Sequence, residues 1–137
     1  MRWEHFRHGA DIGVRGIGMT QGEAFEQIAL ALTAVIAELA SVRTDTPIRI
    51  RREAPDGELL LVDWLNALIF EMATREMLFG RFVVTIRGHA LDATAWGEPL
   101  DRERHKPAVE VKGATYTELN VGQRDDGTWL AQCVVDV

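Results

Sequence analysis

Two segments of the chain carry hydrophobic residues at helical spacing. In the first, Thr20 stands three residues before Glu23, which is the capping-box spacing of a helix N-terminus. The apolar positions that follow lie three or four residues apart and predict an amphipathic helix: Phe25, Ile28, Ala29, Leu32, Val35, Ile36 and Leu39. A second helix is predicted over residues 58–78, after the turn-forming sequence Pro55-Asp56-Gly57. Its first half has almost no polar face, so we expect this helix to be largely buried.

The remaining segments are typical of β-strands. Strands are predicted at residues 2–7, 12–14, 47–53, 82–86, 90–96, 109–112, 115–121 and 129–135. Gly97-Glu98-Pro99 is expected to end the fifth strand, with a charged loop or short helix after it, and Asp126-Gly127 predicts a hairpin between the last two. Because strands dominate the second half without alternating with helices, we predict the α+β class. We expect one compact domain over residues 1–137, with a mainly antiparallel β-sheet packed with two α-helices.

Composition is ordinary for a folded domain, with 47% hydrophobic and 26% charged residues in a chain of 137. Asp63, Asn66 and Glu71 interrupt the longest apolar stretch, which is therefore too short to cross a bilayer. The first residues lack the apolar region of a secretory signal, so we expect a cytoplasmic protein with no membrane contact. The single cysteine, Cys133, excludes an intramolecular disulfide and is expected to be buried.

The formal net charge of −6 argues against broad, nonspecific binding of nucleic acid, because Lys and Arg must neutralise the phosphates. A role in RNA metabolism would then involve RNA only indirectly, through a protein partner. The chain also lacks the phosphate-binding loop, the nucleophile elbow and the zinc-binding helix of common enzyme families. These absences fit a protein that is not an enzyme.

Polar residues near the two ends of the chain are candidates for binding a metal ion. His8 and Asp11 flank a glycine, where they could place two ligands in a crevice or simply form an Asp-capped turn. At the other end, the side chain of Asp136 is adjacent to the carboxylate of Val137. Two adjacent anions suit a hard cation such as Mg²⁺, Ca²⁺ or Mn²⁺, or they form a solvated, frayed chain end.

Three more residues could have a functional role. Asp63 lies on the helix that we expect to be buried, where a carboxylate needs a partner. Asp63 and Asn66 are three residues apart, so they either form a functional pair or a polar strip that meets the backbone of a strand. Lys112 and Tyr116 could bind an anion or a protein partner, or belong to the polar face of a strand.

The order and spacing of these motifs resemble the archease family over nearly the whole chain. The shared motifs are His8-x-x-Asp11-Ile12-Gly13, Ala24-Phe25-Glu26, Leu60-Leu61-x-Asp63-Trp64-Leu65-Asn66 with Leu68-Ile69, Gly97-Glu98 with Asp101, Val111-Lys112-Gly113-Ala114-Thr115-Tyr116, and Val134-Val135-Asp136-Val137. The chain departs from the family pattern at Thr117, where many archeases have His, and at Gly113, where Ala is more usual.

The resemblance implies a protein cofactor of the GTP-dependent RNA ligase that acts in tRNA splicing and RNA repair. That ligase joins 3′-phosphate or 2′,3′-cyclic phosphate ends to 5′-hydroxyl ends, and archeases stimulate its guanylylation and multiple turnover. Carried over by position, the family's divalent-metal site implies Asp11, Asp136 and the carboxylate of Val137 as ligands, with Asp63 and His8 as further candidates. The strand that bears Asp136 should then pair near the strand that follows His8.

Two other functions remain open from the residues. A stand-alone metal-dependent phosphoesterase could use Asp11, Asp63, Asp136 and His8 to activate water on an ion. A chaperone-like adaptor would shield partner proteins from aggregation and would not need Asp11 or Asp136.

Overall fold

The computed structural model describes residues 1–137, and its first helix begins where the capping motif predicts. Helix α1 (Gln21–Ile36) starts after Thr20, whose hydroxyl accepts the backbone N–H of Glu23 at 3.0 Å. The carboxylate of Glu23 in turn accepts the N–H of Met19 at 2.7 Å. The predicted apolar stripe is buried, since Phe25, Ile28 and Leu32 are inaccessible to solvent.

Helix α2 (Gly57–Arg75) ends three residues earlier than the sequence predicts. It starts after Asp56, whose carboxylate accepts the N–H of Leu59 at 2.8 Å. It stops at Glu76, which adopts the left-handed conformation (φ 52°) and turns the chain into the next strand. Because Met77 and Leu78 are buried as strand residues, the hydrophobic pattern that extended the predicted helix belongs to the sheet.

The strands form two antiparallel sheets instead of the one that we predicted. The larger has the order β1 (Arg2–His8), β2 (Asp11–Gly18), β8 (Trp129–Asp136) and β6 (Gly113–Ala114), and β7 (Asn120–Gln123) also pairs with β8. The smaller has the order β3 (Thr46–Glu53), β5 (Ala90–Pro99) and β4 (Met77–Arg87). The predicted hairpin at Gly127 (φ 89°) is confirmed between β7 and β8.

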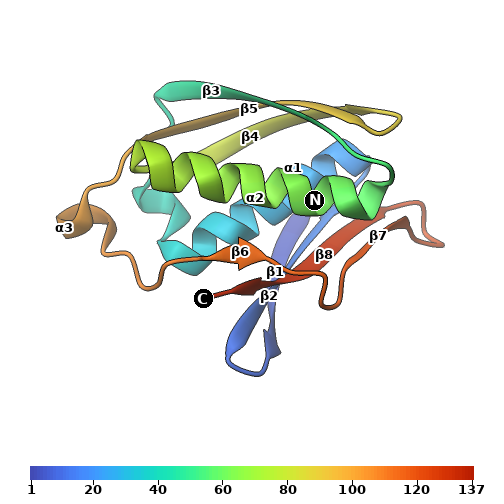
Figure 1. Ribbon diagram of the computed structural model, residues 1–137, viewed down its shortest axis with the longest axis horizontal. Helices are drawn as coiled ribbons and strands as arrows, with labels where there is room; N and C mark the ends of the chain where they lie inside the picture. The colour runs from blue at the N-terminus through green and yellow to red at the C-terminus, as the bar shows by residue number, and fades with distance from the viewer.

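Both long helices lie between the two sheets, so the molecule has three layers (Figure 1). A core of 32 buried residues fills the space between the layers. Trp64 of α2 is fully buried there, and its indole N–H donates to the backbone oxygen of Phe25 in α1 at 3.1 Å. The predicted α+β class is confirmed, and no helix is long and apolar enough to span a membrane.

Glycines at two positions allow these layers to approach closely. A Cβ at Gly16 in β2 would lie 2.2 Å from the backbone oxygen of Ala24 in α1. A Cβ at Gly97 would lie 1.9 Å from the backbone oxygen of Leu78 in β4. The predicted break at Gly97-Glu98-Pro99 is therefore wrong: β5 continues to Pro99, because this glycine lets it pass close to β4.

The region after β5 differs most from the sequence prediction. A short helix, α3 (Arg102–His105), forms in the charged segment, as expected, and a 3-10 turn, η1 (Leu39–Ser41), follows α1. Residues 109–112 are not a strand. The strand predicted over residues 115–121 is interrupted by a turn in which the N–H of Leu119 donates to Tyr116 and Glu118 has a φ of 55°. Of that segment only Asn120 and Val121 belong to a strand, β7, which continues to Gln123 and pairs with β8.

Candidate functional site

The β2–β8 pair brings the two ends of the chain together. Ile12–Val135 is the outermost pair of this antiparallel ladder, so Asp11 and Asp136 are the residues immediately beyond it, one on each strand. The predicted pairing of the strand bearing Asp136 with the strand that follows His8 is therefore confirmed.

The contacts of Asp11 and Asp136 define the surroundings of this site. The carboxylate of Asp11 is half-buried and accepts the backbone N–H of Val137 at 3.4 Å. Asp136 is exposed, and its backbone oxygen accepts the N–H of Lys112 at 2.8 Å. None of the protein's ion pairs involves either carboxylate. Neither carboxylate is therefore neutralised by an ion pair within the protein.

The donor chemistry at this position suits a hard cation, but the set of ligands is small. The available donors are carboxylate and backbone oxygens, which Ca²⁺, Mg²⁺ and Mn²⁺ prefer. No group of three or more His, Cys, Asp or Glu side chains is gathered closely enough to hold an ion. Since hard cations take six or more oxygen ligands, an ion held by Asp11, Asp136 and Val137 would have coordination positions open to another molecule.

His8 lies beside this pair at the tip of the β1–β2 hairpin. It is paired with Asp11 across the hairpin, and Asp136 lies just beyond the last pair of the neighbouring ladder. Its side chain is exposed. The structure therefore places the candidate His8 next to the two aspartates and does not bring it into a compact cluster with them.

Asp63 is exposed, so the expectation that it is a buried carboxylate is wrong. The apolar residues of α2 occupy the faces turned to the core, and Asp63 and Asn66 form a polar strip outside it. The side-chain oxygen of Asn66 accepts the N–H of Ala114 in β6 at 2.9 Å, which confirms the alternative of a polar strip that meets a strand. Gly113 of the same short strand pairs with Asp136, so Asn66 supports the position of β8 near its end.

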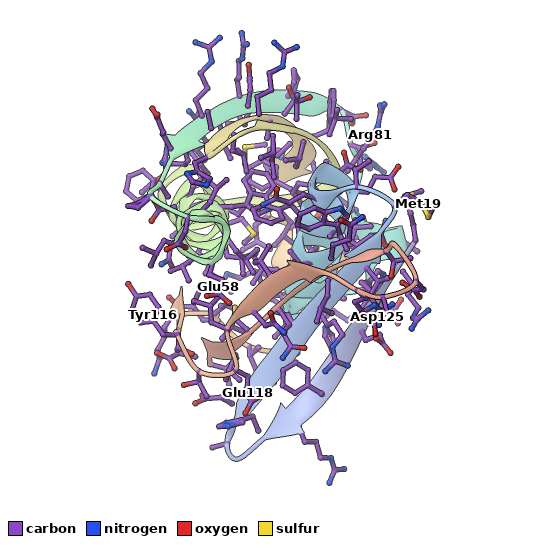
Figure 2. The ribbon with its side chains drawn as sticks, turned by 90° about the vertical axis from the view of Figure 1, so that its right-hand side faces the viewer. Met19, Glu58, Arg81, Tyr116, Glu118 and Asp125 are labelled. Carbon is purple, nitrogen blue, oxygen red and sulfur yellow. The ribbon has the colours of Figure 1, made fainter.

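Lys112 and Tyr116 lie on either side of β6. Lys112 is next to Asp136, because its backbone N–H donates to the backbone oxygen of Asp136. Both side chains are exposed, and Tyr116 is 70% accessible. Figure 2 shows Tyr116 and Glu118 on the loop beside β8. Thr115, between them, donates its hydroxyl to the backbone oxygen of Val134 at 2.8 Å and so holds this loop on the sheet. Their proposed contact with a partner stays a prediction.

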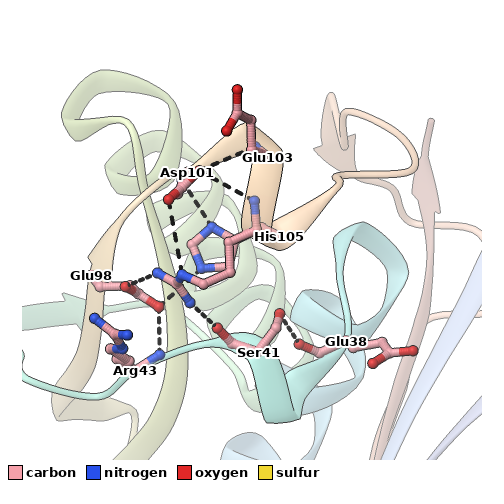
Figure 3. A network of polar contacts seen from close by, with 8 residues as sticks. Glu38, Ser41, Arg43, Glu98, Asp101, Glu103 and His105 are labelled. Atoms are coloured by element: carbon pink, nitrogen blue, oxygen red, sulfur yellow. Dashed lines mark hydrogen bonds and ion pairs between the residues drawn. The ribbon is translucent and has the colours of Figure 1, made fainter.

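A buried polar network around Glu98 has no counterpart among the predicted site residues. Arg104 donates to one oxygen of the Glu98 carboxylate, while the backbone N–H of Arg43 (2.6 Å) and the ring of His105 (2.9 Å) donate to the other (Figure 3). The other ring nitrogen of His105 accepts the N–H of Asp101 at 2.9 Å, which assigns the ring proton to the side facing Glu98. The hydrogen bond from Arg104 lowers the pKa of Glu98 to about 2 despite its burial.

This network has a structural effect that the sequence could have indicated. It ties the end of β5 to α3 and, through the hydrogen bond from Arg104 to the backbone of Ser41, to the turn after α1. Glu98, Asp101, Arg104 and His105 fall within eight residues of each other, and Asp101 has the N-cap position of α3. The sequence signal for this network was a glutamate next to a strand glycine, followed by a capping Asp and two basic residues.

Cys133 is buried, as expected, and burial raises the pKa of its thiol to about 12. The thiolate is the reactive form of cysteine, so this residue is held in its unreactive form at neutral pH.

Comparisons with known proteins cover essentially the whole chain. Residues 3–137 match the Archease protein family (MTH1598/TM1083). "Protein archease" of Pyrococcus furiosus is 40% identical over 99% of this chain and 99% of its own length. "Protein archease" of Methanosarcina barkeri is 37% identical over 99% of this chain and 96% of its own length.

Two solved structures share the fold. The solution structure of Methanobacterium thermoautotrophicum protein 1598 has a TM-score of 0.86 and 32% identity, and 98% of each chain is covered. The crystal structure of a Thermotoga maritima protein, described as an archease and possible chaperone, has a TM-score of 0.57 and 21% identity, over 100% of this chain and 98% of the other. The second likeness concerns the fold alone.

Proposed function

The chain belongs to the archease family, and we propose that it is a non-catalytic activator of a GTP-dependent RNA ligase. In this proposal, the protein stimulates guanylylation of the ligase and its multiple turnover. The ligase itself joins 3′-phosphate or 2′,3′-cyclic phosphate RNA ends to 5′-hydroxyl ends. Family membership supports the proposal, as does the position of Asp11 and Asp136 at adjoining strand ends.

The observation that carries the proposal is the unneutralised pair of carboxylates at the end of β2 and β8. Two like charges that face each other without a cation destabilise the folded state unless something neutralises them. Asp11, Asp136 and the carboxylate of Val137 would hold a divalent cation such as Ca²⁺, Mg²⁺ or Mn²⁺. Bound there, the ion would supply positive charge that polarises phosphate oxygens.

The residues around the pair have separate tasks in this proposal. Asp11 and Asp136 supply the negative oxygens, and the hydrogen bond from Val137 to Asp11 orients one of them. Asn66 and Thr115 hold the neighbouring strand and loop in place, as their hydrogen bonds to Ala114 and Val134 indicate. Exposed Tyr116 and Lys112 would contact the ligase beside the ion.

The test measures guanylylation and turnover of the ligase from the same organism, with GTP, divalent cation and RNA halves. Adding the wild-type protein should convert single turnover into multiple turnover. Asp136→Asn should lose at least tenfold of this stimulation, because it removes a charged ligand while keeping the side-chain shape. Asp125→Asn, the same change on the exposed turn between β7 and β8, serves as the matched control and should keep full stimulation.

Other results would contradict the proposal. Equal stimulation by Asp136→Asn and wild type would exclude a role for the acidic pair. Phosphoester hydrolysis by the protein alone, lost on chelation, would favour the metal-dependent phosphoesterase. Suppression of partner aggregation that does not depend on Asp11 and Asp136 would favour a chaperone-like adaptor, the role that the description of the Thermotoga maritima relative suggests.

A further inference from the structure

The outer face of the three-stranded sheet is cationic, although the whole chain is acidic. Alternate residues of β3 and β4 point away from the helices, and they include four exposed arginines. Arg52 belongs to the other alternation of β3, but it is exposed and borders the same hollow as Arg51 and Arg87, so we include it. We call this the arginine face: Arg49, Arg51, Arg52, Arg81 and Arg87. Figure 2 shows nitrogen-tipped side chains standing off the outer side of β3. Only two carboxylates, Glu53 and Asp92, lie among them, so positive charge remains in excess.

The arginines differ in whether a carboxylate already forms an ion pair with them. Arg49 donates two hydrogen bonds to Asp92, at 3.1 and 2.7 Å, and Arg51 approaches the same carboxylate at 3.8 Å. Arg87 forms no ion pair. A hollow of about 630 Å³ is lined by Arg51, Arg52 and Arg87, with Thr85 in its wall, and the carboxylates of Glu53 and Asp92 also line it. One carboxylate therefore pairs with two arginines, Arg52 donates to the backbone oxygen of Arg51, and Arg87 remains available to an anion.

A planar surface lies at the other end of the same face. The guanidinium of Arg81 stacks over the ring of Trp96, with its central carbon 4.4 Å from the ring centroid. Arg81 and Trp96 are paired across β4 and β5, so the stack lies on the same side of the sheet as Arg49 and Arg51. Guanidinium planes and aromatic rings are the surfaces on which unpaired bases stack.

We propose that the arginine face binds the sugar–phosphate backbone of a single-stranded RNA directly. Arg49 and Arg51 are alternate residues of β3, about 6.6 Å apart, and Arg81 and Arg87 lie toward opposite ends of β4. The cationic groups are therefore spread along the face, which suits a chain of phosphates better than one small anion. The guanidinium fork matches phosphate oxygens in two-point hydrogen bonds. A protein partner would require apolar anchors, and Val83 is the only exposed large hydrophobic residue on this face.

The choice of RNA as the nucleic acid rests on the proposed function, in which the ligase acts on RNA ends. The arginine face and the Asp11–Asp136 site belong to different sheets, so the two proposals can fail independently. The net charge of −6 conceals this face because the excess of acidic residues lies elsewhere on the chain.

Fluorescence anisotropy with a labelled single-stranded RNA of about 12 nucleotides tests the inference, at about 50 and 200 mM salt. The wild-type protein should bind, and log K should fall with log salt with a slope of about −2, as expected for three phosphate contacts. The double variant Arg51→Glu, Arg87→Glu should bind at least tenfold more weakly. Asp136→Asn should bind RNA as well as wild type does, which separates this face from the metal site.

The matched control is Arg7→Glu with Arg102→Glu. Both arginines are exposed, neither forms an ion pair, and the net charge changes by the same amount. This control should retain RNA affinity within about twofold. Absence of binding by the wild type, or equal weakening in both double variants, would overturn the inference. Displacement of the RNA by poly-glutamate as readily as by unlabelled RNA would overturn it as well, since it would show a site for acidic protein.

Discussion

Replacing Glu98 by alanine should lower the free energy of unfolding by about 3–5 kcal/mol, the cost of removing one partner of a buried charged network. Glu98 is only 6% exposed, and His105 is 4% exposed. Without the carboxylate, the buried ring N–H of His105 and the part-buried backbone N–H of Arg43 lose their acceptor. Buried donors without acceptors carry the full cost of desolvation.

Urea unfolding of wild type and Glu98→Ala at neutral pH measures this loss. Glu103→Ala is the matched control, because Glu103 lies on the neighbouring helix with an exposed side chain that forms no ion pair. It should change the free energy of unfolding by less than about 0.5 kcal/mol. Equal effects of the two substitutions would mean that the Glu98 network does not stabilise the fold.

Acid provides a second readout for the same pair of variants. The pKa of Glu98 is lowered from 4.5 to about 2 in the folded protein, so its stabilisation is complete above the unfolded value and is lost as pH falls toward the folded value. Wild type should therefore lose stability between about pH 4.5 and pH 2 more steeply than Glu98→Ala does. Parallel acid profiles would show that Glu98 is not held in its charged form by Arg104.

Gly16→Ala should destabilise the protein by about 3 kcal/mol or more, near the upper end of the range for overpacking. The new Cβ would lie 2.2 Å from the backbone oxygen of Ala24 and 2.4 Å from the backbone nitrogen of Ile28. These are backbone atoms of α1, which cannot move aside as a flexible side chain can. The helix would have to shift away from β2 and open the core that both share.

Thermal and urea unfolding compare this variant with Gly113→Ala, a control at another strand glycine. A Cβ at Gly113 would approach only the side-chain oxygen of Asn66, at an ordinary distance of 3.6 Å. Gly113→Ala should leave stability within about 1 kcal/mol of wild type. A tolerated alanine at Gly16 would show that α1 does not pack on β2 as closely as described.

Local signals in the sequence predicted much of this structure. Thr20 marked a helix start because its side chain accepts a backbone N–H group locally, and the turn Pro55-Asp56-Gly57 marked the start of the second helix. Asp126-Gly127 marked a hairpin because its glycine adopts the positive φ that the turn requires. The family motifs also placed Asp11 and Asp136 on neighbouring strands, which hydrophobic periodicity alone could not do. The pairing of strands from the two ends of the chain depends on the order of the strands in the sheet, and a local sequence pattern does not contain that order.

The errors arose where tertiary contacts outweigh local preference. Gly97-Glu98-Pro99 looked like a strand end, yet the strand continues because a glycine is required against Leu78. Asp63 appeared buried because it follows a run of leucines, although its own helix face is turned outward. The arginine face could not be predicted from the net charge, because a net charge does not say which residues lie on the same side of a sheet.

Titration of the apo protein with Mn²⁺ by calorimetry tests the central claim most directly, which is that carboxylates from the two ends of the chain hold one divalent ion. Wild type should bind a single ion. Asp11→Asn and Asp136→Asn should each weaken binding at least tenfold, while Asp125→Asn should not. Binding that is unchanged in both site variants, or no binding by the wild type, would contradict the claim.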